Sequence, residues 1–458
     1  MEKNKLLNFS IFFSIIFSLS IFLWSLNINF FQVRFLYLIL ILPIFYEIFK
    51  KKIHVEKDQI KIITIFSALI SLILLLNLDN TNQKSILTYI FIFLTFLIIL
   101  FYGHYLKKIE IIIFTFFIFF AISLLLTGKL LLPFSTINSY DPWTDRCGGI
   151  PINLIFNSDQ ITESYLNFKI GINEFIFKEN SHFSILSPAI VLFLTSKFID
   201  TKNTFYRIFI IIIFFIIYNK VTTTFFLSII LSFVLIYAFN FKKFSKKKAT
   251  IFIILISILG VNFINDQNCR KRIDTLVYKI INYSNGYLTN SNLKKNKSLN
   301  NSEVELQENK NKVWIGNMST AVFVKSTEIA FESIIDRPFG WGLNNYILAN
   351  DYYDDIKIYK DYKNYEFAKD LNKSDASNTM IKLIVEIGIF STIILFFLFK
   401  YLINSKIPVD EKLFYFSIII SHFIRGVGYF NSGFIIILIF ILLRSINTNN
   451  INFPYKNL

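Results

Sequence analysis

Long apolar stretches recur along most of this chain, and their length limits what the chain can fold into. A helix rises 1.5 Å per residue, so about 20 residues cross a hydrocarbon core of roughly 30 Å. Lipid offers no hydrogen-bond partners, so an open chain that crosses it must be helical. Apolar residues make up 54% of the 458 residues and charged residues only 17%. The sequence therefore predicts an all-α polytopic integral membrane protein.

About twelve stretches are long and apolar enough to be transmembrane helices. The first is expected to be a retained helix rather than a signal peptide, because no small-residue cleavage site follows it. The expected spans are 7–26, 30–49, 60–78, 86–103, 110–132, 183–197, 204–219, 221–240, 249–265, 378–399, 412–429 and 432–446.

Lys and Arg residues are concentrated in alternate connections between these spans. Positively charged connections stay in the cytoplasm, so both termini are expected there. Among the short connections on the opposite side, the outer side, the basic residues are Lys84 and Lys220. The net charge of +16 comes mostly from the inner flanks, which suit an anionic leaflet. No nucleic-acid partner is needed to explain it.

Two long connections, 133–182 and 266–377, are expected on the outer side. Within the second, residues 284–312 are rich in Asn, Lys and Ser and predict a flexible insert. The predicted organisation is helices 1–5 in 1–132, the first loop in 133–182, helices 6–9 in 183–265, the large loop in 266–377, helices 10–12 in 378–446 and a cytoplasmic tail in 447–458.

A helical period resumes after the insert. The Arg337-Pro338 pair is expected to end this loop helix, because the residue before Pro avoids helical geometry. The face predicted for the helix consists of Ile329, Ala330, Ser333 and Ile334.

The two cysteines, Cys147 and Cys269, fall one in each outer loop. In an oxidising compartment they could pair, and they could equally remain unpaired. The chain's four histidines, His54, His104, His182 and His422, are isolated in the sequence, which predicts no metal site and no cofactor.

Ionisable residues within or beside apolar spans are candidates for function. Arg34, Lys220, His422 and Arg425 are expected in the outer half of their helices. Such cations could grip a lipid phosphate or snorkel to the interface. Snorkelling is the favoured interpretation for Arg34 and phosphate binding for Arg425, while Lys220 stays open. Glu386 is expected to hydrogen-bond a neighbouring helix.

Two further stretches have a functional and a structural interpretation. Glu179 and His182 could form an acid-base pair, or His182 could cap a helix at the interface. In residues 350–367, Tyr residues alternate with Asp351, Asp354 and Asp355. They could bind sugars, or the Tyr residues could anchor the loop at the membrane surface.

Three short motifs occur in order along the chain. KENSHF contains Glu179, Ser181 and His182, ESIIDRPFGWGLNNY contains Pro338, Gly340 and Gly342, and SNTMIKLIVEIGIFS contains Asn378, Glu386 and Gly388. In this combination the chain resembles the O-antigen polymerases and O-antigen ligases of bacterial surface-polysaccharide assembly. The motifs cover about a tenth of the chain, and the expected topology agrees over most of it.

The chain also departs from the pattern of that family. Ser377 stands where the ligases have a histidine, which favours a polymerase over a ligase. Asn180 replaces a Pro, and Ser391 replaces a second Gly. Lys325 only loosely matches a basic residue that these proteins often carry ahead of the Pro-Gly segment.

The resemblance implies a metal-independent glycosyltransferase of the bacterial inner membrane. It would polymerise lipid-linked O-antigen or exopolysaccharide repeat units on the outer face, with undecaprenyl pyrophosphate as the leaving group. Membrane lipids are expected partners, and a chain-length regulator is a candidate partner. The residues expected to bind pyrophosphate are Arg425, Lys220, Arg337 and His422, and those expected to take the proton are His182 and Glu179.

Two alternatives remain at this point. An O-antigen ligase would transfer the glycan to a lipid A core acceptor. A lipid-linked sugar transporter or flippase is the second, although transporters usually carry internal repeats and this chain contains no convincing pair of halves.

Overall fold

The computed structural model describes residues 2–22, 27–28, 31–49, 57–127, 180–218, 222–265, 318–353, 372–376, 378–426 and 428–446. The regular secondary structure in this part is helical apart from one pairing of two-residue strands. The N-terminal elements are α1 (Glu2–Phe22), β1 (Asn27–Ile28), β2 (Phe31–Gln32), η1 (Val33–Leu40), α2 (Ile41–Phe49), α3 (Lys57–Leu76), η2 (Leu78–Asn80), α4 (Gln83–Tyr102), η3 (Gly103–Lys107) and α5 (Ile109–Thr127).

The later elements follow after the first long connection. They are α7 (Asn180–Asp200), α8 (Thr204–Tyr218), α9 (Thr223–Asn240), η6 (Phe241–Lys243), α10 (Lys246–Asn265), α13 (Met318–Asp336), α14 (Tyr346–Tyr352), α17 (Thr379–Ile387), α18 (Phe390–Ile403), α19 (Val409–Ile424), η7 (Asn431–Gly433) and α20 (Phe434–Ile446).

Four helices in the described ranges are long and apolar enough to cross a membrane: Lys57–Leu76, Gln83–Lys107, Thr223–Lys243 and Lys246–Asn265. Shorter apolar helical segments include Asn8–Phe22 of α1, Phe390–Ile403, which is α18, and Asn431–Ile446, which is η7 with α20. The all-helical class predicted from the sequence is therefore confirmed, while the number of twelve crossings stays a prediction.

Two of the expected spans differ from single α-helices. The span expected at 30–49 begins as the 3₁₀ helix η1 and continues as α2. The span expected at 378–399 is divided into α17 and α18 at Gly388, whose φ is +55°. A positive φ is easily adopted by Gly and interrupts the helix at that point.

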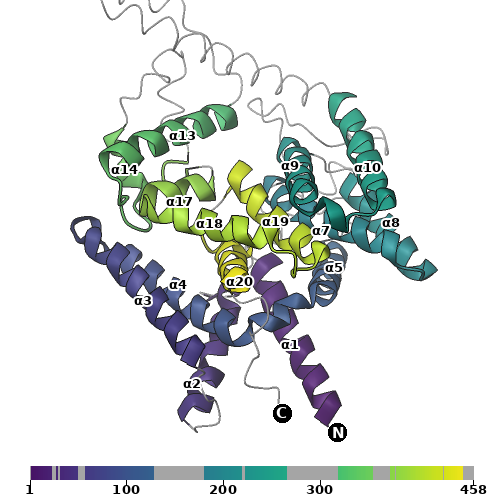
Figure 1. Ribbon diagram of the computed structural model, residues 1–458, viewed down its shortest axis with the longest axis horizontal. Coiled ribbons are helices and arrows are strands. Elements are labelled where there is room, and N and C mark those ends of the chain that lie inside the picture. The colour runs from purple at the N-terminus through teal and green to yellow at the C-terminus, as the bar shows by residue number, and fades with distance from the viewer. Residues whose placement is uncertain are drawn as a thin grey trace, which may run out of the picture.

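Helix α19 lies at the centre of the larger core and packs against both α7 and α9 (Figure 1). Its residues from Glu411 to His422 are all buried. The same apolar cluster includes side chains of α1, α4, α5 and α20. Many of its members lie in α19 and α20, so the part of the chain nearest the C-terminus forms much of the core.

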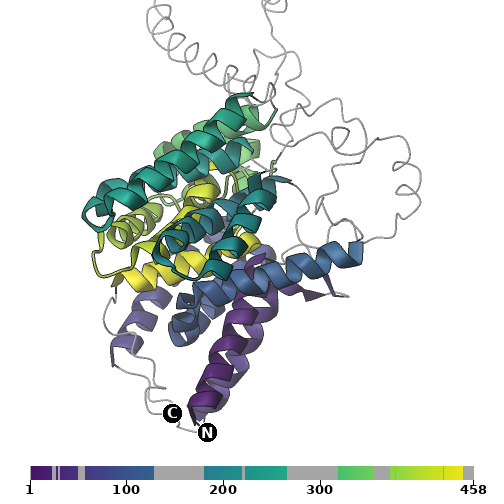
Figure 2. The same cartoon turned by 90° about the vertical axis from the view of Figure 1, so that its right-hand side faces the viewer.

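A second, smaller core joins the loop helices to α17. The helices α13 and α14 lie beside α17 at one end of the bundle (Figures 1 and 2). Ile329, Ala330 and Ser333 are buried there, but Ile334 is 43% exposed. The predicted face was therefore wrong at Ile334, because α17 covers a narrower stripe of α13 than the periodicity suggested. Helix α13 ends at Asp336, just before the Arg-Pro pair, as expected.

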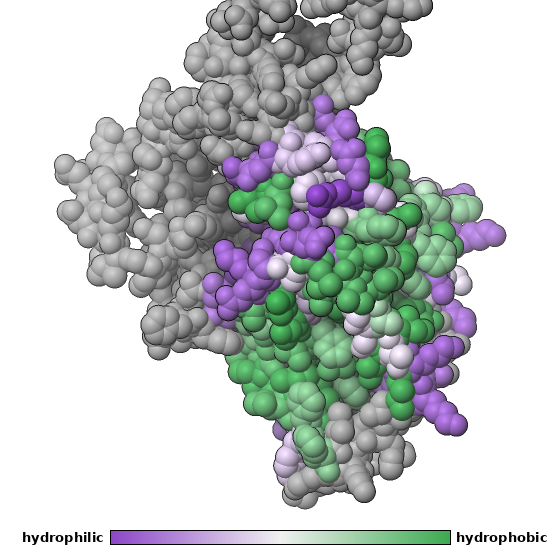
Figure 3. All heavy atoms as spheres, turned by 90° about the vertical axis from the view of Figure 1, so that its left-hand side faces the viewer, coloured by the Kyte–Doolittle hydropathy of each residue, from purple (hydrophilic) through white to green (hydrophobic). Residues whose placement is uncertain are grey.

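The surface that includes α3 is broadly hydrophobic (Figure 3). Hydrophilic residues gather above this area and along one side of it. On α3, Ile65, Leu72 and Leu75 are exposed, which a water-soluble protein would avoid in such a continuous patch. The pattern fits a helix that faces lipid.

Candidate functional site

The segment from Pro338 to Tyr346, here named the glycine turn, packs against the break between α17 and α18. The Trp341 N–H donates to the Val385 carbonyl at 3.1 Å, and the Gly342 N–H donates to the Glu386 carbonyl at 2.8 Å. In the opposite direction, the Ile389 N–H at the helix break donates to the Pro338 carbonyl at 2.7 Å. Three main-chain bonds thus join a loop to the interrupted helix.

This contact requires glycine on both sides. A Cβ on Gly340 would lie 2.4 Å from the Glu386 carbonyl oxygen, and one on Gly388 would lie 2.2 Å from the Pro338 carbonyl oxygen. Both residues also have positive φ, at +83° and +55°. The two glycines, one in each motif noted in the sequence, are therefore needed for the same contact.

The glycine turn also contacts the connection between α3 and α4. The Asn345 side-chain amide donates to the Asn80 carbonyl at 2.7 Å and accepts from the Asn82 amide at 2.9 Å. Asn77 donates to the Phe339 carbonyl at 3.3 Å. The turn therefore bridges two parts of the molecule that lie far apart in the sequence.

Arg337 was predicted to bind pyrophosphate, and the structure places it on an aromatic ring. Its guanidinium lies 4.0 Å from the centre of the Trp341 ring, a cation–π contact. The Trp341 indole N–H donates to the Ser333 hydroxyl at 3.2 Å. The Arg337 side chain stays largely exposed, so its predicted phosphate contact stays a prediction.

The Glu386 carboxylate is the centre of the site and is 0% exposed. It accepts hydrogen bonds from the Asn344 N–H at 2.6 Å, the Tyr346 N–H at 2.9 Å and the Tyr429 hydroxyl. The partner predicted for it was a neighbouring helix. This is confirmed in part, because Tyr346 is the first residue of α14, while the other two donors lie in the glycine turn and in the segment between α19 and α20. We name this carboxylate with its three donors the Glu386 node.

Lys382 lies one helical turn before Glu386 and is 3% exposed. Its ammonium donates to the Ser374 carbonyl at 2.8 Å and lies 3.4 Å from the Asp375 carboxylate. It is also 4.0 Å from the Glu386 carboxylate and 5.4 Å from the centre of the Tyr429 ring. A buried cation is thus held beside the node.

Arg34 comes from the other end of the sequence to the same place. Its guanidinium donates to the Asn431 side chain and interacts electrostatically with Asp375. Gly428 lies near both Asn431 and Asp375. A Cβ on Gly428 would be 3.7 Å from the Asn431 amide nitrogen and 3.8 Å from the Asp375 carboxylate. Arg34, Lys382, Asp375 and Asn431 are named the cation cluster. Snorkelling to the interface, the role favoured for Arg34 from the sequence, stays a prediction.

The end of α19 approaches the start of α17. Asn378 caps α17, accepting from the Met380 and Ile381 N–H groups at 2.9 and 3.0 Å, and donates to the Phe423 carbonyl. This cap explains an Asn at that position of the motif. Arg425 follows α19 directly and is half-buried.

His422 was predicted to bind pyrophosphate together with Arg425. Its imidazole is fully buried, with Nδ1 3.3 Å from the Thr379 hydroxyl and the ring packed on Phe434. In this arrangement its contacts are with protein groups, and its phosphate contact stays a prediction.

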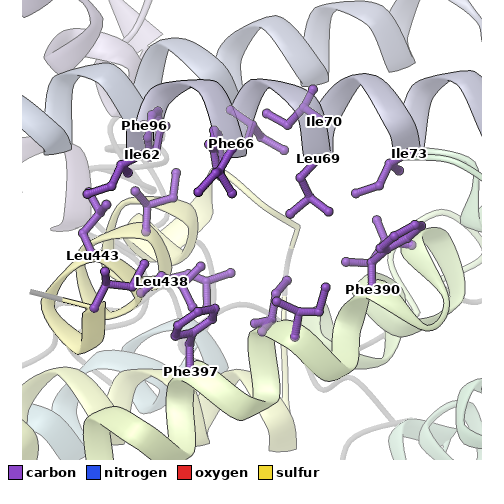
Figure 4. A pocket seen from close by; sticks show the side chains of 18 of the residues that line it. Ile62, Phe66, Leu69, Ile70, Ile73, Phe96, Phe390, Phe397, Leu438 and Leu443 are labelled. Atoms are coloured by element: carbon purple, nitrogen blue, oxygen red, sulfur yellow. The ribbon is translucent and has the colours of Figure 1, made fainter. Parts of the chain in front are cut away.

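An apolar groove of about 740 Å³ lies between α3 and α4 on one side and α18 and α20 on the other (Figure 4). Leu69 of α3 points across it toward α18, whose Phe390 and Phe397 lie on the opposite wall. Its lining on α3 runs from Asp58 to Ile73, which is roughly 22 Å at 1.5 Å per residue.

The two ends of the groove differ in chemistry. One end is lined by Tyr89 and Leu343, and the Leu343 N–H lies 3.4 Å from the Tyr89 hydroxyl. Leu343 belongs to the glycine turn, so this end adjoins the Glu386 node. The other end is lined by charged residues, Asp58, Lys61 and Lys400.

Several predicted residues lie outside the described residues. These are Glu179, Lys220, Ser377, His54, Cys147, Cys269, the insert 284–312, and Asp354 and Asp355. His182 falls within α7, but the structure does not describe its side chain. The acid-base pair, the disulfide and the phosphate contact of Lys220 therefore stay predictions. Among the described residues, no three His, Cys, Asp or Glu side chains gather as metal ligands.

The sequence interpretation missed Lys382 and Asp375. A signal for Lys382 was present, because a lysine four residues before Glu386 in an apolar span is costly unless it is paired. Asp375 had no such signal, since an Asp in a polar loop is common.

No protein-family model, curated protein or solved structure matches the chain.

Proposed function

We propose that this protein polymerises lipid-linked oligosaccharide repeat units of a bacterial surface polysaccharide. It would transfer the growing glycan from undecaprenyl pyrophosphate to an acceptor sugar on the outer face of the inner membrane. The observation that carries the proposal is the apolar groove, whose one end adjoins a buried polar site containing cations. A substrate with a long apolar chain and an anionic head suits both parts.

The groove suits the chain of such a lipid. Its volume of about 740 Å³ would hold roughly 25 water molecules at about 30 Å³ each. Within a membrane the groove competes with surrounding lipid, so close packing rather than the hydrophobic effect must favour one chain. The rows of branched and aromatic side chains on α3 and α18 provide such packing surfaces.

The cation cluster suits the pyrophosphate. In the transfer, the acceptor hydroxyl oxygen forms a bond to the anomeric carbon of the donor glycan. The bond from that carbon to the pyrophosphate oxygen breaks, and undecaprenyl pyrophosphate leaves with the electron pair. Arg34, Lys382 and Arg425 would stabilise the charge that develops on it. The hydroxyl proton would pass to His182 or Glu179, the residues predicted from the sequence.

The experiment uses the full chain in lipid nanodiscs with synthetic undecaprenyl-pyrophosphate repeat units. A ladder of products that differ by one repeat unit supports a polymerase. A single transfer to a lipid A core acceptor would instead indicate a ligase. Movement of the lipid-linked unit across a vesicle membrane without extension would indicate a transporter and overturn the proposal.

A matched pair of variants on α3 tests the groove. Leu69→Trp fills the groove, whereas Leu72→Trp adds the same ring on the exposed side of the helix, where it does not line the groove. We expect Leu69→Trp to lower the rate of extension about tenfold, by excluding part of the chain. Leu72→Trp should extend like the unmodified protein. Equal rates for the two variants would contradict a role for the groove.

A further inference from the structure

The Glu386 side chain is surrounded by hydrogen-bond donors. The Asn344 and Tyr346 N–H groups come from the glycine turn, and the Tyr429 hydroxyl comes from the segment after α19. The Lys382 ammonium is the nearest cation, at 4.0 Å. A carboxylate can accept from all of these donors at once because both of its oxygens are acceptors.

A glutamine at position 386 could not accept the same set of hydrogen bonds. Its amide has one acceptor oxygen and one NH₂ group, and the NH₂ group would face a donor. One or more buried N–H groups would then lose their partner, which is costly. The three main-chain bonds between the turn and the helix break do not depend on this side chain. Loss of the carboxylate should therefore loosen residues 344–346 more than residues 338–342.

The position of Glu386 links this contact to the two parts of the candidate site. Leu343, between the two anchored regions of the turn, lines the end of the groove. Lys382, on the same helix, belongs to the cation cluster and is held by Ser374 and Asp375. Tyr429 is two residues before Asn431, which accepts a hydrogen bond from Arg34.

We propose that Glu386 is a positioning residue that fixes the glycine turn on α17. By holding residues 344–346, it sets the end of the groove relative to the cation cluster. The anchoring of the turn stands on the hydrogen bonds alone, and its effect on glycan transfer rests on the proposed function.

The first test is amide hydrogen exchange at single-residue resolution, on the full chain in nanodiscs. In the unmodified protein, the Asn344 and Tyr346 amides should exchange as slowly as the amides inside α17. Exchange of these two amides at the rate of an open loop would overturn the proposal without any variant being needed.

The second test compares Glu386→Gln with Glu332→Gln, which alters an exposed glutamate on α13. In Glu386→Gln, the Asn344 and Tyr346 amides should exchange about 10 to 100 times faster, while amides of α19 keep their rates. Glu332→Gln should change neither. Unchanged exchange in Glu386→Gln would mean that Glu386 only fills space.

The third test measures transfer of lipid-linked repeat units. Glu386→Gln should mainly lower kcat, because the groove can still take up the chain while the head is misplaced. Glu386→Asp, which keeps the charge, should recover part of the rate. Faster exchange with unchanged transfer would overturn the positioning role. Absence of transfer in the unmodified protein would overturn the proposed function, while the exchange result would still decide whether Glu386 anchors the turn.

Discussion

Two buried carboxylates in the C-terminal helices, Glu386 and Glu411, are stabilised in different ways. Glu411 lies in the first turn of α19 and pairs with Arg444 of α20, with 3.1 Å between the Arg444 Nε and the Glu411 carboxylate and both side chains nearly buried. Glu386 accepts instead from two main-chain N–H groups where the glycine turn meets α14, and from a tyrosine hydroxyl. The first carboxylate joins a helix to a helix, and the second joins a helix to a turn.

Two buried lysines show the same contrast. Lys412 donates to the Leu402 and Asn404 carbonyls, each at 2.7 Å, and to the Asn240 side chain at 2.6 Å. It thereby satisfies carbonyls at the end of α18 that have no helical partner. Lys382 is held by a loop carbonyl and a half-buried aspartate. The Glu411 region is thus a closed structural contact, whereas the Glu386 region contains groups that a ligand could engage.

The largest expected effect is at the helix-to-helix pair. Glu411→Gln leaves Arg444 buried without its counter-charge and should lower the free energy of unfolding by about 3 to 5 kcal/mol. The double change Glu411→Leu with Arg444→Met should recover most of this loss, because two apolar groups can replace a buried pair. Equilibrium unfolding in detergent measures both.

Two controls sharpen this comparison. Asp200→Asn, which removes the exposed partner of Lys248, should cost less than about 1 kcal/mol. Glu386→Leu with Lys382→Met should not recover stability, because the Asn344 and Tyr346 N–H groups remain without an acceptor. Full recovery there would mean that the two carboxylates have the same role.

The next largest effect is at the glycines of the turn contact. Gly340→Ala and Gly388→Ala should each lower the free energy of unfolding by about 3 kcal/mol, from a close main-chain contact and a positive φ. Thermal unfolding measures the change. Gly260→Ala is the control, since its Cβ would meet only the far end of the Phe226 ring at 3.3 Å. Similar losses in all three variants would contradict the special role of the turn.

A smaller effect, on rate, is expected at the cation cluster. Lys382→Met should lower glycan transfer about 100-fold, roughly 2.7 kcal/mol, by removing a cation near the leaving pyrophosphate. Initial rates with lipid-linked repeat units measure it. Lys373→Met removes a lysine that pairs with Asp351 at 2.7 Å at the surface, and its rate should stay close to normal. An unchanged rate in Lys382→Met would mean that Lys382, like Lys412, has only a structural role.

The smallest effect concerns pH and the loop helix. Burial, and next the neighbouring Glu332 carboxylate, raise the pKa of Glu328 from its usual 4.5 to about 7. Between these values the folded protein binds more protons than the unfolded chain, so the free energy of unfolding falls as pH rises and levels off above about 7. Glu328 is partly exposed, so solvent screening limits the change to at most about 1 kcal/mol.

Glu328→Gln tests this dependence. The variant should lose the part of the pH dependence between 4.5 and about 7 that is due to this carboxyl group. Unfolding measured at several pH values detects it, and a pH profile identical to that of the unmodified protein would contradict the assignment.

Much of the architecture follows from the sequence alone. Apolar stretches must form helices in lipid because the main chain has no other partners there. Arg337-Pro338 marks the end of α13 because the residue before Pro resists helical geometry. The glycines at 340 and 388 also stood out in the sequence, although their partners did not.

Only the tertiary structure decided which groups meet. Glu386 and Tyr346 are 40 positions apart, and Asn345 and Asn80 are 265 apart. Hydrogen bonds of this kind depend on how a loop packs on helices, and neither periodicity nor composition records that packing. For the same reason the sequence did not predict the hydrogen bond from Arg34 to the Asn431 side chain. The sequence determined the helices and the special residues, and three-dimensional packing brought them together as a site.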